Sequence, residues 1–225
     1  MTRRKIQPLA LSRERILEGA LELIEAGGLP AFSTRKLGAQ LGCEAMSIYH
    51  HFPSKQHLLD ALVEQAIASV DVPAPTEDGA ENERRLRLSL ASYREMARRW
   101  PALFPLVALH RLNMPTGVRF IESILRLMRS VEPDIERAAR LFRAIGYYLI
   151  GSGLEETAGY ARGPSAAEPV GNDLIARECP NLVAAAPYFQ ERHWERTFWF
   201  GIEALLAEPR REPTARARTA SRGRR

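Results

Sequence analysis

The chain has 225 residues, of which 45% are hydrophobic and 26% are charged, with a formal net charge of +5. This length is enough to bury a substantial core, and the composition is that of an ordinary globular protein. No apolar run approaches the ~20 residues of a membrane-spanning helix, and the basic N-terminus lacks the apolar core of a signal peptide. Cys43 and Cys179 show no metal-ligand spacing and fit reduced thiols. These properties predict a cytoplasmic protein and exclude membrane and disulfide-rich classes.

The positive charge is concentrated at the C-terminus. Residues 209–225 contain seven arginines and one glutamate, a net +6, so residues 1–208 sum to −1. This segment has almost no large apolar residue and is predicted to be a disordered basic tail. It is either a solvated terminus or an auxiliary, sequence-independent contact to phosphates. Specific DNA recognition therefore cannot be argued from the net charge.

The N-terminal part predicts an arm followed by a helical unit. Residues 1–11 are expected to be a flexible basic arm, either simply disordered or in contact with DNA. Residues 12–70 are expected to form four helices, the first from about Ser12 to Ala26 and the fourth from about Lys55 to Val70. The segment after residue 70, DVPAPTEDGA, is rich in proline and acidic residues and marks a domain boundary.

The stretch from Ser33 to Lys55 has the pattern of two short helices joined by a tight turn. Ser33 or Thr34 can cap the first helix, and Gly42 follows where a helix end favours a positive φ. Ile48 and Phe52 are expected to point inward from the second helix. This is the helix-turn-helix pattern, whose second helix can enter the major groove of DNA. The non-core residues left free to touch bases are Ala45, Met46, Ser47 and His50.

The run LGCEAMSIYHHFPSKQHLLDAL resembles the DNA-binding domain of the tetracycline-repressor (TetR) family of bacterial regulators. The matching positions are Leu41, Gly42, Tyr49, His51, Phe52, Lys55, Leu58 and Leu59, preceded by Thr34, Arg35 and Leu37. The resemblance covers about the first 65 residues. It implies that Thr34, Tyr49 and Lys55 contact phosphates. It also implies that Arg35 reads a base, the alternative being a plain surface charge, and that Ala45, Met46, Ser47 and His50 occupy variable recognition positions.

Residues 80–208 predict a second, helical domain with no strand, so the fold class is all-α with nine to ten helices in total. A long helix is expected from about Asp134 to Tyr160 and a last helix from about Tyr188 to Ala207. Between them, residues 162–187 are rich in glycine, proline and alanine and predict an exposed or partly ordered loop.

The two late helices predict a homodimer interface. Glycines in a helix cost up to about 1 kcal/mol each, a cost usually offset by close approach of another backbone or a ligand. The last helix carries aromatic residues around most of its circumference. A two-fold dimer accounts for both features, and the family resemblance implies the same pairing. The alternative is that both helices are central in a monomer core. The predicted interface residues are Gly146, Gly153, Trp194, Phe198, Gly201 and Leu205.

A set of aromatic side chains with few polar groups predicts a small-molecule pocket in the second domain. The alternative for many of them is ordinary core packing. The predicted pocket residues are Trp100, Phe104, Val107, His110, Phe120, Phe142, Tyr147 and Glu155. By resemblance, His110 and Glu155 occupy positions where tetracycline repressors hold a drug-bound magnesium ion, yet Asp71 stands where a drug-binding histidine is expected. We therefore predict no metal cofactor, with a divalent metal bound together with the ligand as the minor alternative.

These observations predict a ligand-responsive DNA-binding transcriptional regulator, a repressor released from a palindromic operator by a small molecule. The expected partners are double-stranded DNA, a small-molecule effector and a second copy of the chain, with no membrane. One alternative is a DNA-binding regulator without small-molecule control. The other is a helical carrier or enzyme, against which the sequence shows no glycine-rich phosphate loop and no clustered nucleophile, base and orienting group.

Overall fold

A computed structural model describes residues 11–110, 112–158 and 166–207, and all regular structure within these ranges is helical. This confirms the all-α prediction, with eleven α-helices where nine to ten were expected. None of the described helices is long and apolar enough to cross a membrane. The helices are α1 Arg13–Gly27, α2 Thr34–Leu41, α3 Ala45–Tyr49, α4 Lys55–Ala68, α5 Gly79–Arg99, α6 Phe104–Leu109, α7 Pro115–Val131, α8 Ile135–Ala158, α9 Asn172–Glu178, α10 Pro180–Ala185 and α11 Trp194–Leu206. The predicted basic tail and nearly all of the predicted N-terminal arm lie outside the described ranges.

Three serines define the starts of the N-terminal helices. The side chain of Ser12 accepts a hydrogen bond from the backbone amide of Arg15 in α1, and Ser33 and Ser54 do the same for α2 and α4. Each bond satisfies an amide that has no partner within its own helix. The four helices enclose a shared core of fully buried side chains, which includes Ile16, Ile24, Leu37, Ile48, Phe52, Leu58 and Leu62.

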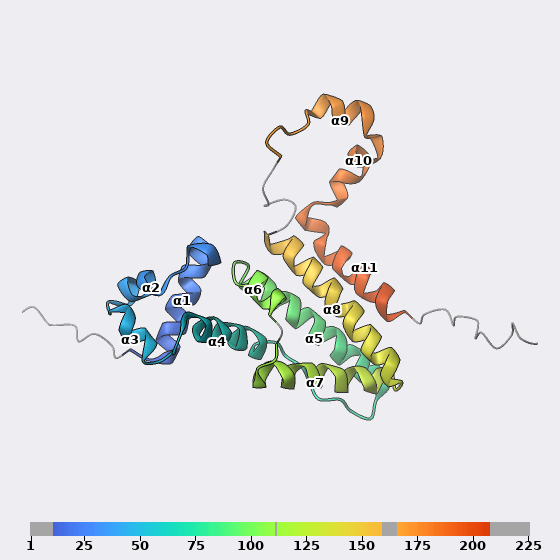
Figure 1. Cartoon of the computed structure of the whole chain (residues 1–225). Helices are drawn as coiled ribbons and strands as arrows, with labels where there is room; N and C mark the ends of the chain where they lie inside the picture. The colour runs from blue at the N-terminus through green and yellow to red at the C-terminus, as the bar shows by residue number, and fades with distance from the viewer. Residues whose placement is uncertain (1–10, 111, 159–165, 208–225) are drawn as a thin grey trace, which may run out of the picture.

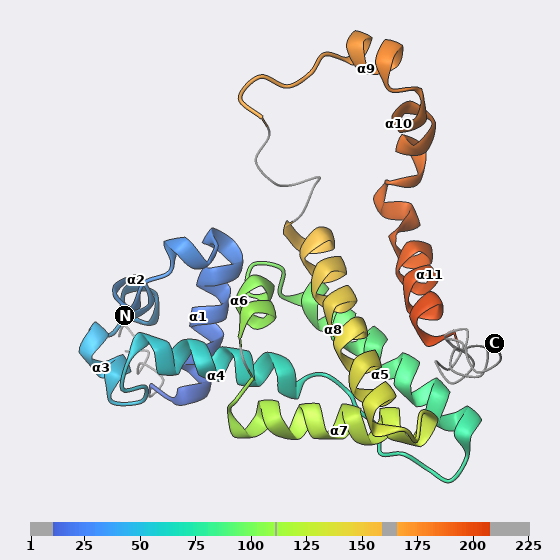
Figure 2. The same cartoon turned by 45° about the vertical axis from the view of Figure 1, so that its right-hand side comes forward.

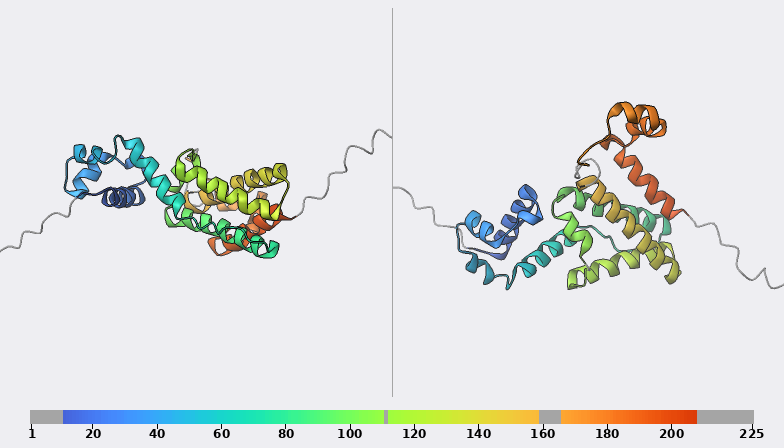
Figure 3. Two further views of the ribbon diagram at one scale, coloured as in Figure 1. Left: turned by 90° about the horizontal axis from the view of Figure 1, so that it is seen from below. Right: turned by 45° about the horizontal axis from the view of Figure 1, so that its top comes forward.

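Helix α4 joins two parts of the molecule. Figure 3 shows α1–α3 toward the N-terminal end of α4, and α5–α8 with α11 toward its C-terminal end. Contacts run from α4 to α5, α6 and α7, so its C-terminal half belongs to the packing of the larger part. A movement of α4 would therefore move α1–α3 relative to the remaining helices.

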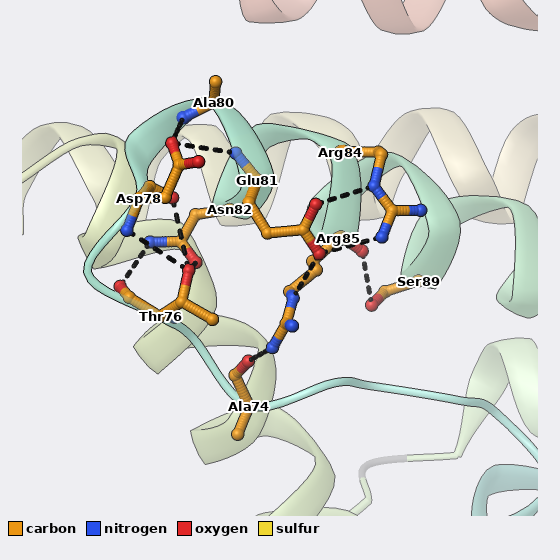
Figure 4. Close-up of polar contacts among 9 residues, drawn as sticks. All are labelled: Ala74, Thr76, Asp78, Ala80, Glu81, Asn82, Arg84, Arg85 and Ser89. Atoms are coloured by element: carbon orange, nitrogen blue, oxygen red, sulfur yellow. Dashed lines mark hydrogen bonds and ion pairs between the residues drawn. The ribbon is translucent and has the colours of Figure 1, made fainter.

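The proline-rich segment after α4 is fixed to the start of α5 by a polar cluster (Figure 4). Asp78 caps α5, its carboxylate accepting from the amides of the first turn. The buried amide of Asn82 accepts from the Thr76 backbone N–H at 2.7 Å and donates to the Thr76 carbonyl at 2.9 Å. Arg85 donates to the Ala74 carbonyl. The domain boundary predicted here therefore coincides with a connection whose backbone groups are bonded to α5.

The second part is built on α5, α7, α8 and α11, with α7 running across the ends of the others, and these helices pack around a common core. Arg94 of α5 is almost fully buried and makes two-pronged hydrogen bonds to Glu156 of α8, with Nε–O distances of 3.0 and 3.1 Å. It also forms an ion pair with Glu195 of α11. A single side chain from α5 thus ties together the two late helices.

The loop predicted over residues 162–187 contains two helices where the structure describes it. Helices α9 and α10 occupy residues 172–185 and project away from the other helices (Figures 1 and 2). The glycine, proline and alanine content suggested a loop, but proline disrupts a helix only when it lies in the helix interior. Pro180 stands at the first position of α10, where the missing N–H costs nothing. The last helix correspondingly begins at Trp194, later than expected.

Candidate DNA-binding surface and ligand cavity

The turn between α2 and α3 is set by two glycines. Gly42 has φ 70°, in the left-handed region, and the Cys43 amide donates to the Gly38 carbonyl at 2.9 Å, the bonding of a Schellman helix end. A Cβ on Gly38 would lie 2.7 Å from the Cys43 carbonyl oxygen, so only glycine lets α3 pack this closely. Gly42 was predicted from the sequence and Gly38 was not, although a glycine inside a helix, four residues before the turn, is a signal for it.

Helix α3 buries one side and exposes the other. Ile48 is completely buried, while Met46 is 64% exposed and His50 is also exposed. Ala45 and Ser47 are half-buried beside them. This short helix therefore presents the four predicted recognition residues on or near its outer side, as a groove-reading helix must.

The three predicted phosphate-contacting residues lie around α3. The hydroxyls of Thr34 and Tyr49 are 3.2 Å apart, which joins the start of α2 to the end of α3. The ammonium of Lys55, the first residue of α4, donates to the Phe32 carbonyl at 3.1 Å. Arg35 is exposed in the first turn of α2. Hydroxyl and ammonium groups held in fixed positions can orient a protein on the phosphate backbone.

A cavity of about 420 Å³ opens between α5, α7 and α8. Its wall is mainly apolar, and two of its rings, Tyr93 and Phe120, lie nearly parallel with centroids 6.3 Å apart. Burial raises the pKa of the Tyr93 phenol to about 12, so this group stays neutral. The lining residues are Ser89, Leu90, Tyr93, Ala108, His110, Leu112, Phe120, Ile121, Ile124, Met128, Phe142, Arg143, Ile145, Gly146, Tyr147, Leu149 and Ile150.

Four of the eight predicted pocket residues line this cavity: His110, Phe120, Phe142 and Tyr147. The other four, Trp100, Phe104, Val107 and Glu155, are absent from its wall within the described residues. Phe104 and Val107 belong to the closed core, and the Phe104 ring lies 2.5 Å from where a Cβ on Gly153 would stand. Periodicity placed these side chains on an inward face without showing which inward faces enclose empty space.

Several lining residues, among them Tyr93 and Arg143, are not among the predicted pocket residues. The ring of Tyr93 stacks beside that of Phe120 in the cavity wall. Arg143 is exposed at the edge of this wall, and because an arginine on a long helix ordinarily faces water, its residue type does not predict a place at a cavity. Its distance of four residues from Tyr147 is the available signal, since residues at i and i+4 share one helix face.

The predicted dimer residues fall into two groups. Phe198 is only 1% exposed and packs inside this chain, and the position of a Cβ on Gly201 is occupied by the Tyr148 ring. Phe104 explains Gly153 in the same way. Close packing within one chain accounts for these three positions, and the predicted interface stays a prediction. Trp194 and Leu205 remain half-buried, and Gly146 borders the cavity.

Helix α6 is bonded to α1 at one end and to α4 at the other. The carboxylate of Glu25, on α1, accepts hydrogen bonds from the backbone amides of Ala102 at 3.1 Å and Leu103 at 3.0 Å, just before α6. These are free amides at a helix start, where a carboxylate is stabilised. At the other end, His110 Nε2 lies 3.1 Å from the carboxylate of Asp60, on α4.

His110 connects this link to the cavity. It lines the cavity, and its Nδ1 accepts from the Leu112 amide at 3.2 Å. With Nδ1 accepting, Nε2 carries the proton and donates to Asp60. Leu112 also lines the cavity and adopts φ 53°, an uncommon and strained conformation for a side chain of this size. A ligand in the cavity would therefore touch both His110 and a strained segment next to it.

The described residues contain no group of three or more His, Cys, Asp or Glu side chains that could hold a metal ion. His110 faces the cavity, whereas Glu155 is exposed on α8 and outside the lining. The two residues that the resemblance linked to a magnesium-bound drug therefore do not meet in this cavity of the single chain.

The fold and these two sites define a helical DNA-binding regulator. Residues 16–62 match the model of the family described as "Bacterial regulatory proteins, tetR family". Over 215 residues, 88% of this chain and 92% of the relative, the chain is 31% identical to the tetracycline repressor protein class G of Vibrio anguillarum. The chain belongs to the tetR family of bacterial regulatory proteins.

Solved structures show the same relationship. The TetR-family protein ActR of Streptomyces coelicolor, in complex with actinorhodin, is 26% identical with a TM-score of 0.67, covering 88% of this chain and 97% of that one. A possible TetR-family transcriptional regulator of Streptomyces coelicolor A3(2) is 26% identical with a TM-score of 0.72, covering 87% and 97%. The similarity thus extends over both the helix-turn-helix unit and the cavity-bearing helices.

Proposed function

We propose that this protein is a transcriptional repressor that binds a palindromic DNA operator as a homodimer and releases it when a small molecule enters the cavity. The observation that carries the proposal is the pair of hydrogen-bonded links from α6 to the N-terminal unit, Glu25 to the amides before α6 and His110 to Asp60. They join a cavity-lining residue to the helices that carry the DNA-facing surface. Similarity to a tetracycline repressor and to a ligand-bound TetR-family structure supports the same function.

The proposed mechanism is a shift between two conformations. A ligand that contacts His110 and Leu112 stabilises the conformation in which α6 fits it best. Because α6 is bonded to α1 and α4, that conformation places the recognition helices differently. DNA affinity then falls by the ratio of the ligand's affinities for the two conformations, and by no more than that.

The homodimer is proposed to form through α8 and α11. Phe200 on α11 is 78% exposed, and Gly151 on α8 is exposed with open space at its Cβ position, which leaves room for a partner helix. A two-fold dimer covers both copies of this surface and sets two recognition helices at a fixed spacing, as a palindromic operator requires.

DNA binding without ligand control is the second candidate, and a helical carrier or enzyme is the third. Retention on random-sequence DNA that is lost as salt rises, together with no turnover, separates a regulator from an enzyme. A mobility-shift titration on the operator then tests ligand control. We expect a cavity ligand to release the DNA, and an operator complex unaffected by every ligand that binds the protein would contradict the proposal.

A further inference from the structure

Among the described residues that line the cavity, Arg143 on α8 carries the one full charge, and there is no carboxylate. Tyr93 stays a neutral phenol. His110 is bonded on both ring nitrogens, to Asp60 and to the Leu112 amide. Within the described wall, a single guanidinium therefore sets the electrostatic character of the cavity.

The charge of Arg143 has no carboxylate partner in the described part of the chain. Its guanidinium donates to the Tyr147 hydroxyl at 2.8 Å and lies 4.8 Å from the centroid of that ring. The two preceding arginines of α8 differ in this respect, since Arg137 pairs with Glu132 and Arg140 with Glu136. Arg143 is thus a cation at the mouth of the cavity, oriented by a tyrosine.

The interior beyond the mouth suits a flat, apolar body. Tyr93 and Phe120 lie with their ring planes only 23° apart, and Phe142 and Ile124 complete the apolar wall. Aromatic surfaces of this kind favour stacking with another ring. Ser89 supplies a hydroxyl, which donates to the Arg85 carbonyl.

We propose that the effector is a flat aromatic molecule bearing an anionic group, with its rings packed against the stacked Tyr93–Phe120 pair and its anion paired with Arg143. This inference deepens the proposed function and rests on the same cavity. A guanidinium binds a carboxylate or sulfonate through charge-assisted hydrogen bonds, which are stronger than bonds between neutral groups. An electrically neutral aromatic molecule would gain the stacking but not this contact.

Two fluorescent probes with the same rings separate the two contributions. 1-Anilinonaphthalene-8-sulfonate carries a sulfonate, and N-phenyl-1-naphthylamine is its neutral counterpart. Their dissociation constants are measured by titration against the full-length wild type, Arg143→Met and the matched control Arg140→Met, which alters an exposed arginine of the same helix outside the cavity wall. We expect Arg143→Met to weaken the anionic probe about tenfold, that is about 1.4 kcal/mol, and the neutral probe less than twofold.

Further variants keep the test decisive. Arg143→Lys should restore most of the affinity for the anionic probe, while Phe120→Ala should weaken both probes. Equal weakening of both probes by Arg143→Met, no weakening of either, or a wild type that does not bind the anionic probe would each overturn the inference. Operator binding by Arg143→Met is measured in parallel. The DNA-facing surface is remote from the cavity mouth. Operator binding retained by Arg143→Met therefore shows that the proposed ligand class can be wrong while the proposed DNA-binding function holds.

Discussion

The helix-turn-helix unit and the cavity are both made of helices, but they differ in the origin of their parts. The DNA-facing surface comes from one continuous stretch, Ser33 to Lys55, whose caps and turn depend on residues three to five positions apart. The cavity wall comes from helices spread over residues 89–150. Local chemistry builds the first site, whereas the second exists only once distant helices have packed.

The largest expected effect is on the stability of the cavity-bearing helices, when one partner of their buried ion pair is removed. Arg94→Met removes the guanidinium that neutralises Glu156, leaving a carboxylate with 8% exposure unpaired. Breaking a buried ion pair costs about 3–5 kcal/mol. We expect chemical denaturation followed by circular dichroism to show this loss in the transition of the α5–α8–α11 helices.

The double variant Arg94→Met/Glu156→Leu is the control, since it removes both charges and should recover much of the stability. If the single variant unfolded at the wild-type denaturant concentration, the pair would have no part in holding α5, α8 and α11 together.

Substitutions at two glycines distinguish packing within the chain from packing against a partner chain. Gly201→Ala places a methyl where the Tyr148 ring lies, and we expect a loss of about 1–3 kcal/mol. Gly151 on α8 is exposed with no atom near its Cβ position in this chain, so Gly151→Ala should stabilise an isolated chain by up to about 1 kcal/mol. Thermal unfolding and sedimentation measure both variants.

A Gly151→Ala protein that is less stable and more monomeric would instead show that a partner chain approaches this position. That result would support the dimer through α8 while contradicting the expectation drawn from the single chain.

Within the DNA-facing surface, Arg35 and Lys55 should differ in their effect on sequence specificity. We expect Arg35→Ala to cost about 1–3 kcal/mol of operator binding and to relax specificity at one base position. Lys55→Ala should weaken binding to all sequences alike and lower the slope of affinity against salt by about one. Mobility-shift titrations at several salt concentrations distinguish the two, and full affinity with Arg35→Ala would remove its base-reading role.

A smaller effect than at the DNA-facing surface is expected on the connection between the two regions. Glu25→Gln keeps the size of the side chain but removes the charge that binds the amides before α6. We expect the coupling between ligand and DNA to fall by about 0.5–2 kcal/mol, with ligand affinity nearly unchanged. The measurement is operator affinity with and without saturating ligand. Glu22→Gln, on the same helix but bonded to Gln40, is the control and should leave the coupling unchanged.

Much of the N-terminal unit could be predicted from sequence because its determinants are local. The cap at Ser33, the turn at Gly42 and the inward Ile48 and Phe52 all follow from short spacings, and the structure confirms them. Gly38 escaped because its role depends on α3 lying against α2, which is a tertiary contact.

The cavity could be predicted only in outline. His110, Phe120, Phe142 and Tyr147 were found from their aromatic or polar character, but no spacing shows that Phe104 fills the core beside Gly153 while Tyr93 faces empty space. The glycines of α8 and α11 are a related case. Their glycines do signal close packing, yet at Gly153 and Gly201 the neighbour is a ring of the same chain.

The proposed function requires the stretch from Ser33 to Lys55 to read DNA as one of two copies in a dimer. Selection of bound sequences from a random DNA pool is the decisive experiment. We expect enrichment of a palindrome whose two half-sites are about one helical turn, or a multiple of it, apart. Enrichment of a single unpaired half-site would contradict the dimer, and no enrichment at all would contradict specific DNA reading by this surface.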